Sequence, residues 1–394
     1  MTSRIEDARA GLSDDVRDAV TLEFEEVDEQ LATMVAVQTE ERPRGGVLIT
    51  QRLGLDGERP ETLTLIGARY GLSRDRVRQL YTRAVGQMIR RVQATGYPNT
   101  ALFAERYPVD WHDERLVRRL LAEIYATDSD IAGQELAYLR LRLAGHALMD
   151  AKRVAGFVFQ RIAGWQQRGR WHLATPRTTE PTAGQLVPLL RRVDWPRSTP
   201  EPLPESPVPT PDAADDARGS VFAEKLGRQT TFDTALEARL LRMLDDSEQV
   251  AGFTERPGAV DYHLDGAERT HYPTAAARLT DGRTVLIDVA PLSRLAVHGN
   301  RAKLTAAHEW AHDRGWGWLA YTGSHLGEPD LLRHDVAARH ENILRNRLAT
   351  GPVGWAEFRP IADETGIDLV DLTGMVLRHG WRYDRGPFRL SAGM

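Results

Sequence analysis

A proline-rich stretch in the middle of the chain constrains its architecture more than any other feature. The segment PRSTPEPLPESPVPTPD, which ends at Asp212, favours extended polyproline II backbone and cannot build a packed core of its own. A chain of 394 residues is long enough for two or three domains. We therefore expect separately folded regions on the two sides of a flexible linker over residues 173–218.

The residue composition excludes several kinds of site. Cysteine is absent, which excludes disulfides, iron–sulfur clusters, thiolate zinc sites and a cysteine nucleophile. No apolar run approaches the roughly 18–20 residues that span a bilayer, and residues 1–10 show no signal-peptide pattern. The expected location is therefore the cytoplasm, without a membrane partner.

Charge is segregated along the chain, although the net formal charge is only −5. Residues 1–41 carry twelve acidic side chains against three arginines, and their apolar residues recur at helical spacing. This pattern predicts amphipathic helices with a solvated acidic face; the alternative is an acidic segment that covers a basic surface or docks on a partner. Residues 59–91 have the opposite balance, with eight arginines against two acids.

The basic segment contains a helix-turn-helix pattern within residues 42–98. The sequence predicts a short helix from Leu63 to Tyr70, which Gly71 can end in the left-handed conformation, and Ser73 is a suitable N-cap for a second helix. Two helices joined by a short turn that contains glycine are typical of this motif. The second helix would present arginines to the bases and phosphates of duplex DNA.

The stretch from Val47 to Arg90 resembles region 4 of the sigma-70 family of transcription initiation factors, through its LGLDG…TL lead-in and its SRDRVRQL helix. The resemblance implies that this helix reads double-stranded DNA and that RNA polymerase is a further candidate partner. Asp75 stands where the family usually has Glu, so the base preference can differ. The resemblance implies that Arg74, Asp75, Arg78 and Gln79 read DNA, and Arg69, Arg76 and Arg83 complete the expected DNA-binding set. The chain lacks the aromatic-rich segment that melts promoters, so it is not expected to initiate transcription alone.

The C-terminal half predicts an α/β domain over residues 219–326. An amphipathic helix, short strand-like runs, a β-branched run from Thr284, a helix that ends at Asp313 and a last strand follow one another. This order resembles the restriction-endonuclease-like fold, in particular the TnsA-type transposase endonucleases. The expected fold class is α+β multidomain, with an all-α helix-turn-helix region, a helical connector over residues 99–172, the endonuclease-like domain and a C-terminal tail.

The TnsA-type resemblance implies a metal-dependent phosphodiesterase site that this chain has partly lost. In that family carboxylates hold Mg²⁺ against a phosphate while a lysine activates the attacking water. Glu237 and Asp288 match two of the four roles, but Thr274 replaces the metal-binding Asp and Ala290 replaces the Lys. We therefore expect a pseudonuclease without catalytic residues or a cofactor. The alternative is an active endonuclease that uses Mg²⁺, with Lys303 supplied from the next helix.

A second metal pattern competes with this interpretation. Residues 308–312 read H-E-x-x-H, so His308 and His312 lie one turn apart on a predicted helix and can bind zinc, with Glu309 as general base. Trp318 occupies the position of the third His of metzincins. The other candidate third ligands are Glu328, His334, His340 and Glu341. A zinc protease is therefore an alternative, although so short a pattern often arises by chance.

The tail, residues 327–394, has two predicted helices and a β-hairpin typical of a winged helix. It either contacts DNA phosphates or caps the α/β domain. Its candidate phosphate-binding residues are Arg378, Arg382, Arg385 and Arg389. The sequence as a whole predicts a sequence-selective DNA-binding protein associated with transcription, mobile elements or defence. A TnsA-like endonuclease and an RNA polymerase accessory factor are the alternatives.

Overall fold

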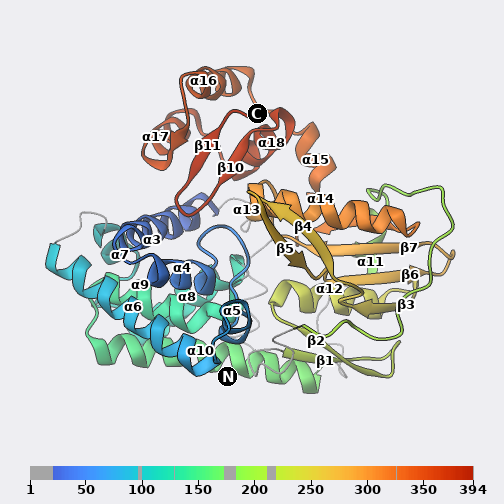
Figure 1. Cartoon of the computed structure of the whole chain (residues 1–394), viewed down its shortest axis with the longest axis horizontal. Helices are drawn as coiled ribbons and strands as arrows, with labels where there is room; N and C mark the ends of the chain where they lie inside the picture. Colours follow the sequence, from blue (N-terminus) through green and yellow to red (C-terminus); the bar gives the residue numbers. More distant parts are fainter. Residues whose placement is uncertain are drawn as a thin grey trace. The chain divides into compact units, whose positions relative to one another are not determined.

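The computed structural model describes residues 21–95, 100–127, 129–172, 183–210, 219–324 and 326–393, so the first part of the acidic segment, residues 1–20, lies outside it. The chain divides into two compact units. Unit 1 comprises Met1–Gly164, Ala337–Leu372 and Gly380–Met394, and unit 2 comprises Trp165–Val336 and Thr373–His379. The expected mixture of a helical N-terminal region and later sheets is confirmed (Figure 1). None of the described helices is both long and apolar enough to cross a membrane.

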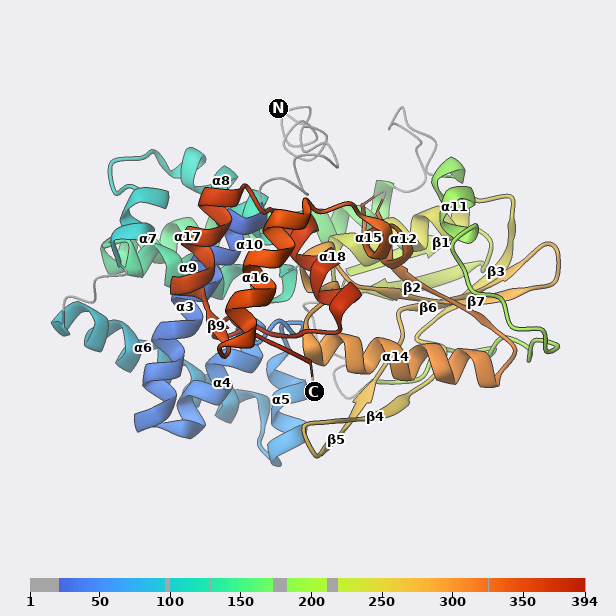
Figure 2. The same cartoon turned by 90° about the horizontal axis from the view of Figure 1, so that it is seen from above.

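The N-terminal part of unit 1 is a group of helices around one apolar core. Its elements are α3 (Thr21–Glu41), α4 (Pro43–Leu53), α5 (Leu63–Tyr70), α6 (Arg74–Thr95), α7 (Thr100–Arg106), α8 (Asp113–Ala126), the short 3-10 helix η1 (Asp130–Ala132), α9 (Gly133–Leu143) and α10 (Leu148–His172), whose last residues belong to unit 2. Apolar residues at helical spacing fill the core, such as Val27 and Leu31 of α3 and Leu116 and Leu120 of α8. The helices α4, α5 and α6 lie side by side in Figure 1 and in Figure 2.

An ion network is buried inside this helical core. Arg140 of α9 is only 1% exposed, and its guanidinium lies 2.8 Å from Asp28 Oδ1 of α3 and 3.1 Å from Glu123 Oε2 of α8. The Tyr107 hydroxyl donates a hydrogen bond to the same Glu123 carboxylate. A buried charge of this kind is tolerated because opposite charges and hydrogen bonds surround it.

The C-terminal part of unit 1 combines helices with a small antiparallel sheet. Its elements are α16 (Ala338–Ala349), β9 (Val353–Gly354), α17 (Trp355–Thr365), α18 (Leu369–His379), whose last residues belong to unit 2, β10 (Arg382–Asp384) and β11 (Arg389–Ser391). The strand order in the sheet is β10-β11-β9. The predicted hairpin is therefore present, with Leu390 paired to Tyr383 on one side and to Val353 on the other.

The tip of this hairpin is anchored on the acidic helix α3. The buried Arg385 guanidinium lies 2.7 Å from Glu25 Oε2, and the Phe388 N–H donates a hydrogen bond to Glu29 Oε2 at 2.5 Å. Burial raises the pKa of Glu29 to about 7. Glu25, Asp28 and Glu29 are thus buried partners of basic and N–H groups, which differs from the solvated acidic face expected from the sequence.

One of the candidate phosphate-binding arginines of the tail is placed differently from the expectation. Arg385, at the hairpin tip where a wing would meet phosphates, is enclosed by carboxylates of the same unit. Arg382 lies 2.8 Å from Asp384, and Arg378 donates a hydrogen bond to the His334 carbonyl oxygen. The contacts of Arg385 arise because the hairpin tip packs on α3. Arg385 is therefore not available for phosphate contacts in this arrangement.

Unit 2 is built around a four-stranded mixed sheet. Its elements are α11 (Ala183–Leu190), β1 (Gly219–Ala223), β2 (Arg228–Phe232), α12 (Ala235–Asp246), β3 (Val250–Glu255), β4 (Val260–Leu264), β5 (Ala267–His271), β6 (Ala275–Leu279), β7 (Thr284–Val289), α13 (Leu292–Leu295), α14 (His298–Asp313), β8 (Gly317–Tyr321) and α15 (Glu328–Arg333). The order is β3-β6-β7-β8, with β7 and β8 parallel and the other neighbours antiparallel. The β1–β2 and β4–β5 hairpins stand apart from this sheet, and β4–β5 lies beside α14 (Figure 2).

The two faces of the four-stranded sheet are covered by different helices (Figure 1). Side chains alternate along β7, so Val285 and Ile287 pack in the core that contains the apolar residues of α12. Leu286, between them, packs in the smaller core with Ala307 and Ala311 of α14. The helix α14 also serves as the crossover between the parallel strands β7 and β8, as parallel pairing requires.

Residues 191–210, which we name the strap, differ from the flexible linker expected over residues 173–218. Asp194 forms an antiparallel bridge with Trp318 of β8. The Glu201 N–H donates to the Arg314 carbonyl oxygen at 2.9 Å, and the Trp316 indole N–H donates to the Glu201 carbonyl oxygen at 2.9 Å. Extended proline-rich backbone makes no hydrogen bonds within itself, so its polar groups pair with neighbouring elements. The strap is therefore part of unit 2.

Candidate functional site

The predicted helix pair is formed by α5 and α6, and local capping fixes both ends of the turn between them. The Thr62 side chain caps α5, Gly71 ends that helix with a φ of 64°, and Ser73 Oγ accepts a hydrogen bond from the Arg76 N–H at 3.3 Å. Short polar side chains are favoured at such N-caps, and glycine adopts positive φ without steric cost. The sequence therefore specifies this turn locally.

A small apolar core holds α6 against α5. Leu63 and Ile66 of α5 and Val77 of α6 are buried together with Leu48 of α4. At Gly67 of α5 an added Cβ would lie only 2.5 Å from the Leu72 carbonyl oxygen, so the turn passes very close to this helix. The apolar side of α6 is thus fixed, which leaves its opposite side outward.

The outward side of α6 carries the residues expected to read DNA. Asp75, Gln79 and Arg83 recur at every fourth position, so they follow one another along the helix surface. All six expected residues of this helix are exposed: Arg74, Asp75, Arg76, Arg78, Gln79 and Arg83. Because an α-helix fits the major groove of B-DNA, this side could meet base edges and phosphates at once.

Several of the expected residues make contacts within unit 1. Arg69, at the end of α5, lies 2.7 Å from Glu61 Oε1. Arg76 donates a hydrogen bond to the Gln79 amide oxygen at 3.3 Å. Both contacts are on the surface, where ion pairs and hydrogen bonds contribute little net free energy and exchange readily for phosphate contacts.

Glu237 makes hydrogen bonds that stabilise the start of α12. Its Oε2 accepts a hydrogen bond from the Asp233 N–H at 2.7 Å, while the Thr234 hydroxyl accepts from the Glu237 N–H at 3.3 Å. These reciprocal bonds satisfy N–H groups that a helix start leaves unpaired. Glu237 therefore caps α12.

Asp288 is buried on the α14 face of the sheet. Its Oδ1 lies 2.7 Å from His271 Nε2, and its Oδ2 accepts a hydrogen bond from the Trp318 indole N–H at 3.0 Å. At the other two positions that the resemblance singled out, Thr274 Oγ1 accepts from the Val289 N–H and the Ala290 N–H donates to the Tyr321 carbonyl oxygen. Within the described residues, neither Glu237 nor Asp288 belongs to a group of three potential metal ligands.

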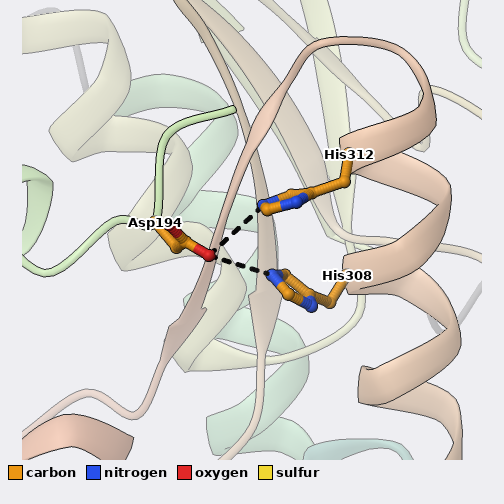
Figure 3. Close-up of side chains that lie close together, drawn as sticks. All are labelled: Asp194, His308 and His312. Atoms are coloured by element: carbon orange, nitrogen blue, oxygen red, sulfur yellow. Dashed lines mark ion pairs between the residues drawn. The ribbon is translucent and has the colours of Figure 1, made fainter. Parts of the chain in front are cut away.

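The described residues do contain one such group, formed by Asp194, His308 and His312 (Figure 3). The two histidines project from successive turns of α14, and Asp194 reaches them from the strap. Asp194 Oδ2 lies 3.9 Å from His308 Nε2 and 3.7 Å from His312 Nε2. Burial, followed by the neighbouring His312, lowers the pKa of His308, which favours the neutral imidazole at pH 7.

The sequence predicted the two histidines of this group but not its third member. Trp318 does not replace a ligand; it packs edge-on against the His308 ring with 5.4 Å between centroids. Glu309, expected as a general base, is exposed and is not in the group. The other third ligands considered, Glu328, His334, His340 and Glu341, are not in the group either. No local signal marked Asp194, because it lies in the segment expected to be a linker.

Comparison of the chain with protein-family models, with curated proteins and with solved structures finds no match. Function must therefore be inferred from the outward side of α6 and from the group formed by Asp194, His308 and His312.

Proposed function

We propose that this chain binds double-stranded DNA with sequence preference and that α6 is its recognition helix. The observation that carries the proposal is the outward side of α6, where the first two turns expose Arg74, Arg76, Arg78 and Gln79 beyond a capped turn. The resemblance to sigma-70 region 4 favours a transcription-associated role, with RNA polymerase as a second partner.

Arginine and glutamine suit the two tasks that such a helix performs. Arginine donates two parallel hydrogen bonds to guanine in the major groove, and glutamine pairs with adenine in the same way. Arginines at the edges of the helix bind phosphates and release counterions, which makes binding weaken steeply with salt. On this proposal, Arg78 and Gln79 contribute sequence preference, while Arg83, further along the helix, contributes phosphate affinity.

The Arg78→Ala/Gln79→Ala variant is expected to lose sequence preference. Duplexes selected by the wild-type chain from a random library would be compared with a scrambled duplex by fluorescence anisotropy at fixed salt. Removing one bidentate pair of hydrogen bonds to a base costs about 1–3 kcal/mol, so affinity for the selected duplex should fall roughly 10- to 100-fold or more. Affinity for the scrambled duplex should change far less.

A matched control is available on another helix of unit 1. Gln160 and Arg161 of α10 are exposed and have the same side-chain types, so Gln160→Ala/Arg161→Ala should leave both affinities unchanged. Sequence-selective binding that survives the Arg78→Ala/Gln79→Ala change would show that α6 is not the recognition helix.

For unit 2 we propose an endonuclease-like domain that does not cleave DNA. The order α12, β3, β6, β7, α14, β8 agrees with the restriction-endonuclease-like resemblance, which supports a similar fold. The contacts of Glu237 and Asp288 support loss of the metal site, since both carboxylates satisfy neighbouring N–H groups or the His271 ring. Such a domain would serve as a binding platform.

Purified protein is therefore expected to leave supercoiled plasmid intact in the presence of Mg²⁺ or Mn²⁺. Thr274 cannot supply the carboxylate that binds the metal ion, and Ala290 cannot supply the lysine that activates the attacking water; phosphodiester cleavage needs both. Agarose electrophoresis over a range of protein concentrations measures nicking. Nicking that disappears in Glu237→Ala would establish an active endonuclease and overturn this part of the proposal.

A further inference from the structure

The three side chains Asp194, His308 and His312 are arranged around a common point (Figure 3). Each side chain offers one potential ligand atom, and these three atoms lie within 4.8 Å of one another. Zn–N and Zn–O bonds are about 2.0–2.2 Å, so two ligands at a tetrahedral angle lie roughly 3.3 Å apart. The 3.7 Å and 3.9 Å separations from Asp194 Oδ2 are a few tenths of an ångström longer, within reach of small side-chain rotations.

The same separations are too long for hydrogen bonds. His312 Nε2 is shielded from solvent and has no hydrogen-bond partner within the described residues. The two imidazole rings are also close, with 4.2 Å between their centroids. A cation between the three groups would bind the shielded nitrogen, the second imidazole and the carboxylate together.

The elements that carry the ligands are held firmly by other contacts. His308 and His312 belong to one helix at i and i+4, the spacing that places two imidazoles on one side. Asp194 is bridged to Trp318 of β8, and the strap is hydrogen-bonded again at Glu201. Trp318 packs against His308 and donates a hydrogen bond to Asp288, so the indole beside the site is held in place.

We propose that Asp194, His308 and His312 bind one Zn²⁺ ion, which fastens the strap to α14. Two imidazoles and one carboxylate form a set that zinc accepts with a fourth position left for water. The hard cation Mg²⁺ prefers oxygen ligands and binds such a set poorly. The site lies wholly in unit 2, and the inference is independent of DNA binding by α6. It differs from the sequence-based zinc protease in taking Asp194 as the third ligand and in leaving Glu309 out.

Isothermal titration of metal-stripped, tag-free full-length protein tests the site. Zn²⁺ is expected to bind one ion per chain and to raise the melting temperature, whereas Mg²⁺ at the same concentration does neither. His308→Ala, His312→Ala and Asp194→Asn should each weaken Zn²⁺ binding about 100-fold or more, because each removes one ligand. Asp194→Asn changes no residue of the packed core, so it separates ligand loss from misfolding.

The matched control is His263→Ala. His263 is an exposed histidine on β4 in the same unit, and its replacement should leave Zn²⁺ affinity unchanged. Absence of stoichiometric Zn²⁺ binding by the wild type would overturn the proposal. So would Zn²⁺ binding of unchanged affinity in both His312→Ala and Asp194→Asn. DNA affinity measured on the same samples distinguishes failure of this site from failure of the α6 proposal.

Discussion

Replacing Arg140 with methionine is expected to destabilise unit 1 by about 3–5 kcal/mol, one of the two largest effects that the structure predicts. The guanidinium of Arg140 is almost fully buried and lies between the carboxylates of Asp28 and Glu123. Methionine fills a similar volume but supplies no positive charge. Two carboxylates would then remain in the core without this cation, and the contacts of Glu123 with Tyr107 and Arg119 would not replace it.

Hydrogen exchange of peptides from α8 and α9 measures this change within unit 1 alone, which avoids assuming that both units unfold together. Arg118→Met on α8 is the matched control, since the Arg118 side chain is 68% exposed and its pair with Glu114 is on the surface. The double change Arg140→Met/Glu123→Gln should recover part of the loss, because it also removes one of the two carboxylates that Arg140 paired with. A loss below about 1 kcal/mol for Arg140→Met would show that the network is not the anchor described here.

The features that the sequence predicted well are those specified by near neighbours. Thr62, Gly71 and Ser73 define the α5–α6 turn through side-chain caps and a positive φ, each of which depends on only a few adjacent residues. The strand from Thr284 and the helix that ends at Asp313 were also marked by local patterns.

The features that the sequence did not predict are long-range pairings. The contact of Arg385 with Asp28 joins residues 357 positions apart, and an arginine in a hairpin tip looks the same whether it faces a phosphate or a buried carboxylate. The sequence predicted that the acidic residues of α3 face solvent. The charge of a residue does not indicate which distant partner will bury it. Asp194 was missed for a related reason. A proline-rich sequence predicts extended backbone, but whether that backbone is held in place depends on distant partners such as Arg314 and Trp316.

The second large effect is expected from Trp316→Ala, which should destabilise unit 2 by about 3–5 kcal/mol. Trp316 is 1% exposed and packs with Leu286, Ala307 and Ala311 under α14. Removing the indole leaves a cavity in this small core and also removes the hydrogen bond to the Glu201 carbonyl oxygen of the strap. Hydrogen exchange of α14 and β8 peptides measures the loss, and unchanged protection would contradict the packing described.

The conservative variant Trp316→Phe separates the two contributions of this side chain. Phenylalanine keeps most of the buried apolar surface but cannot donate to Glu201, so the stability loss should be only about 1–2 kcal/mol. The strap would then be held less firmly at Glu201, and Asp194 with it, although no metal ligand has changed. Zn²⁺ affinity should therefore fall about tenfold, as it does when groups that orient metal ligands are removed. Unaltered Zn²⁺ affinity in Trp316→Phe would mean that the Asp194–Trp318 bridge alone positions the carboxylate.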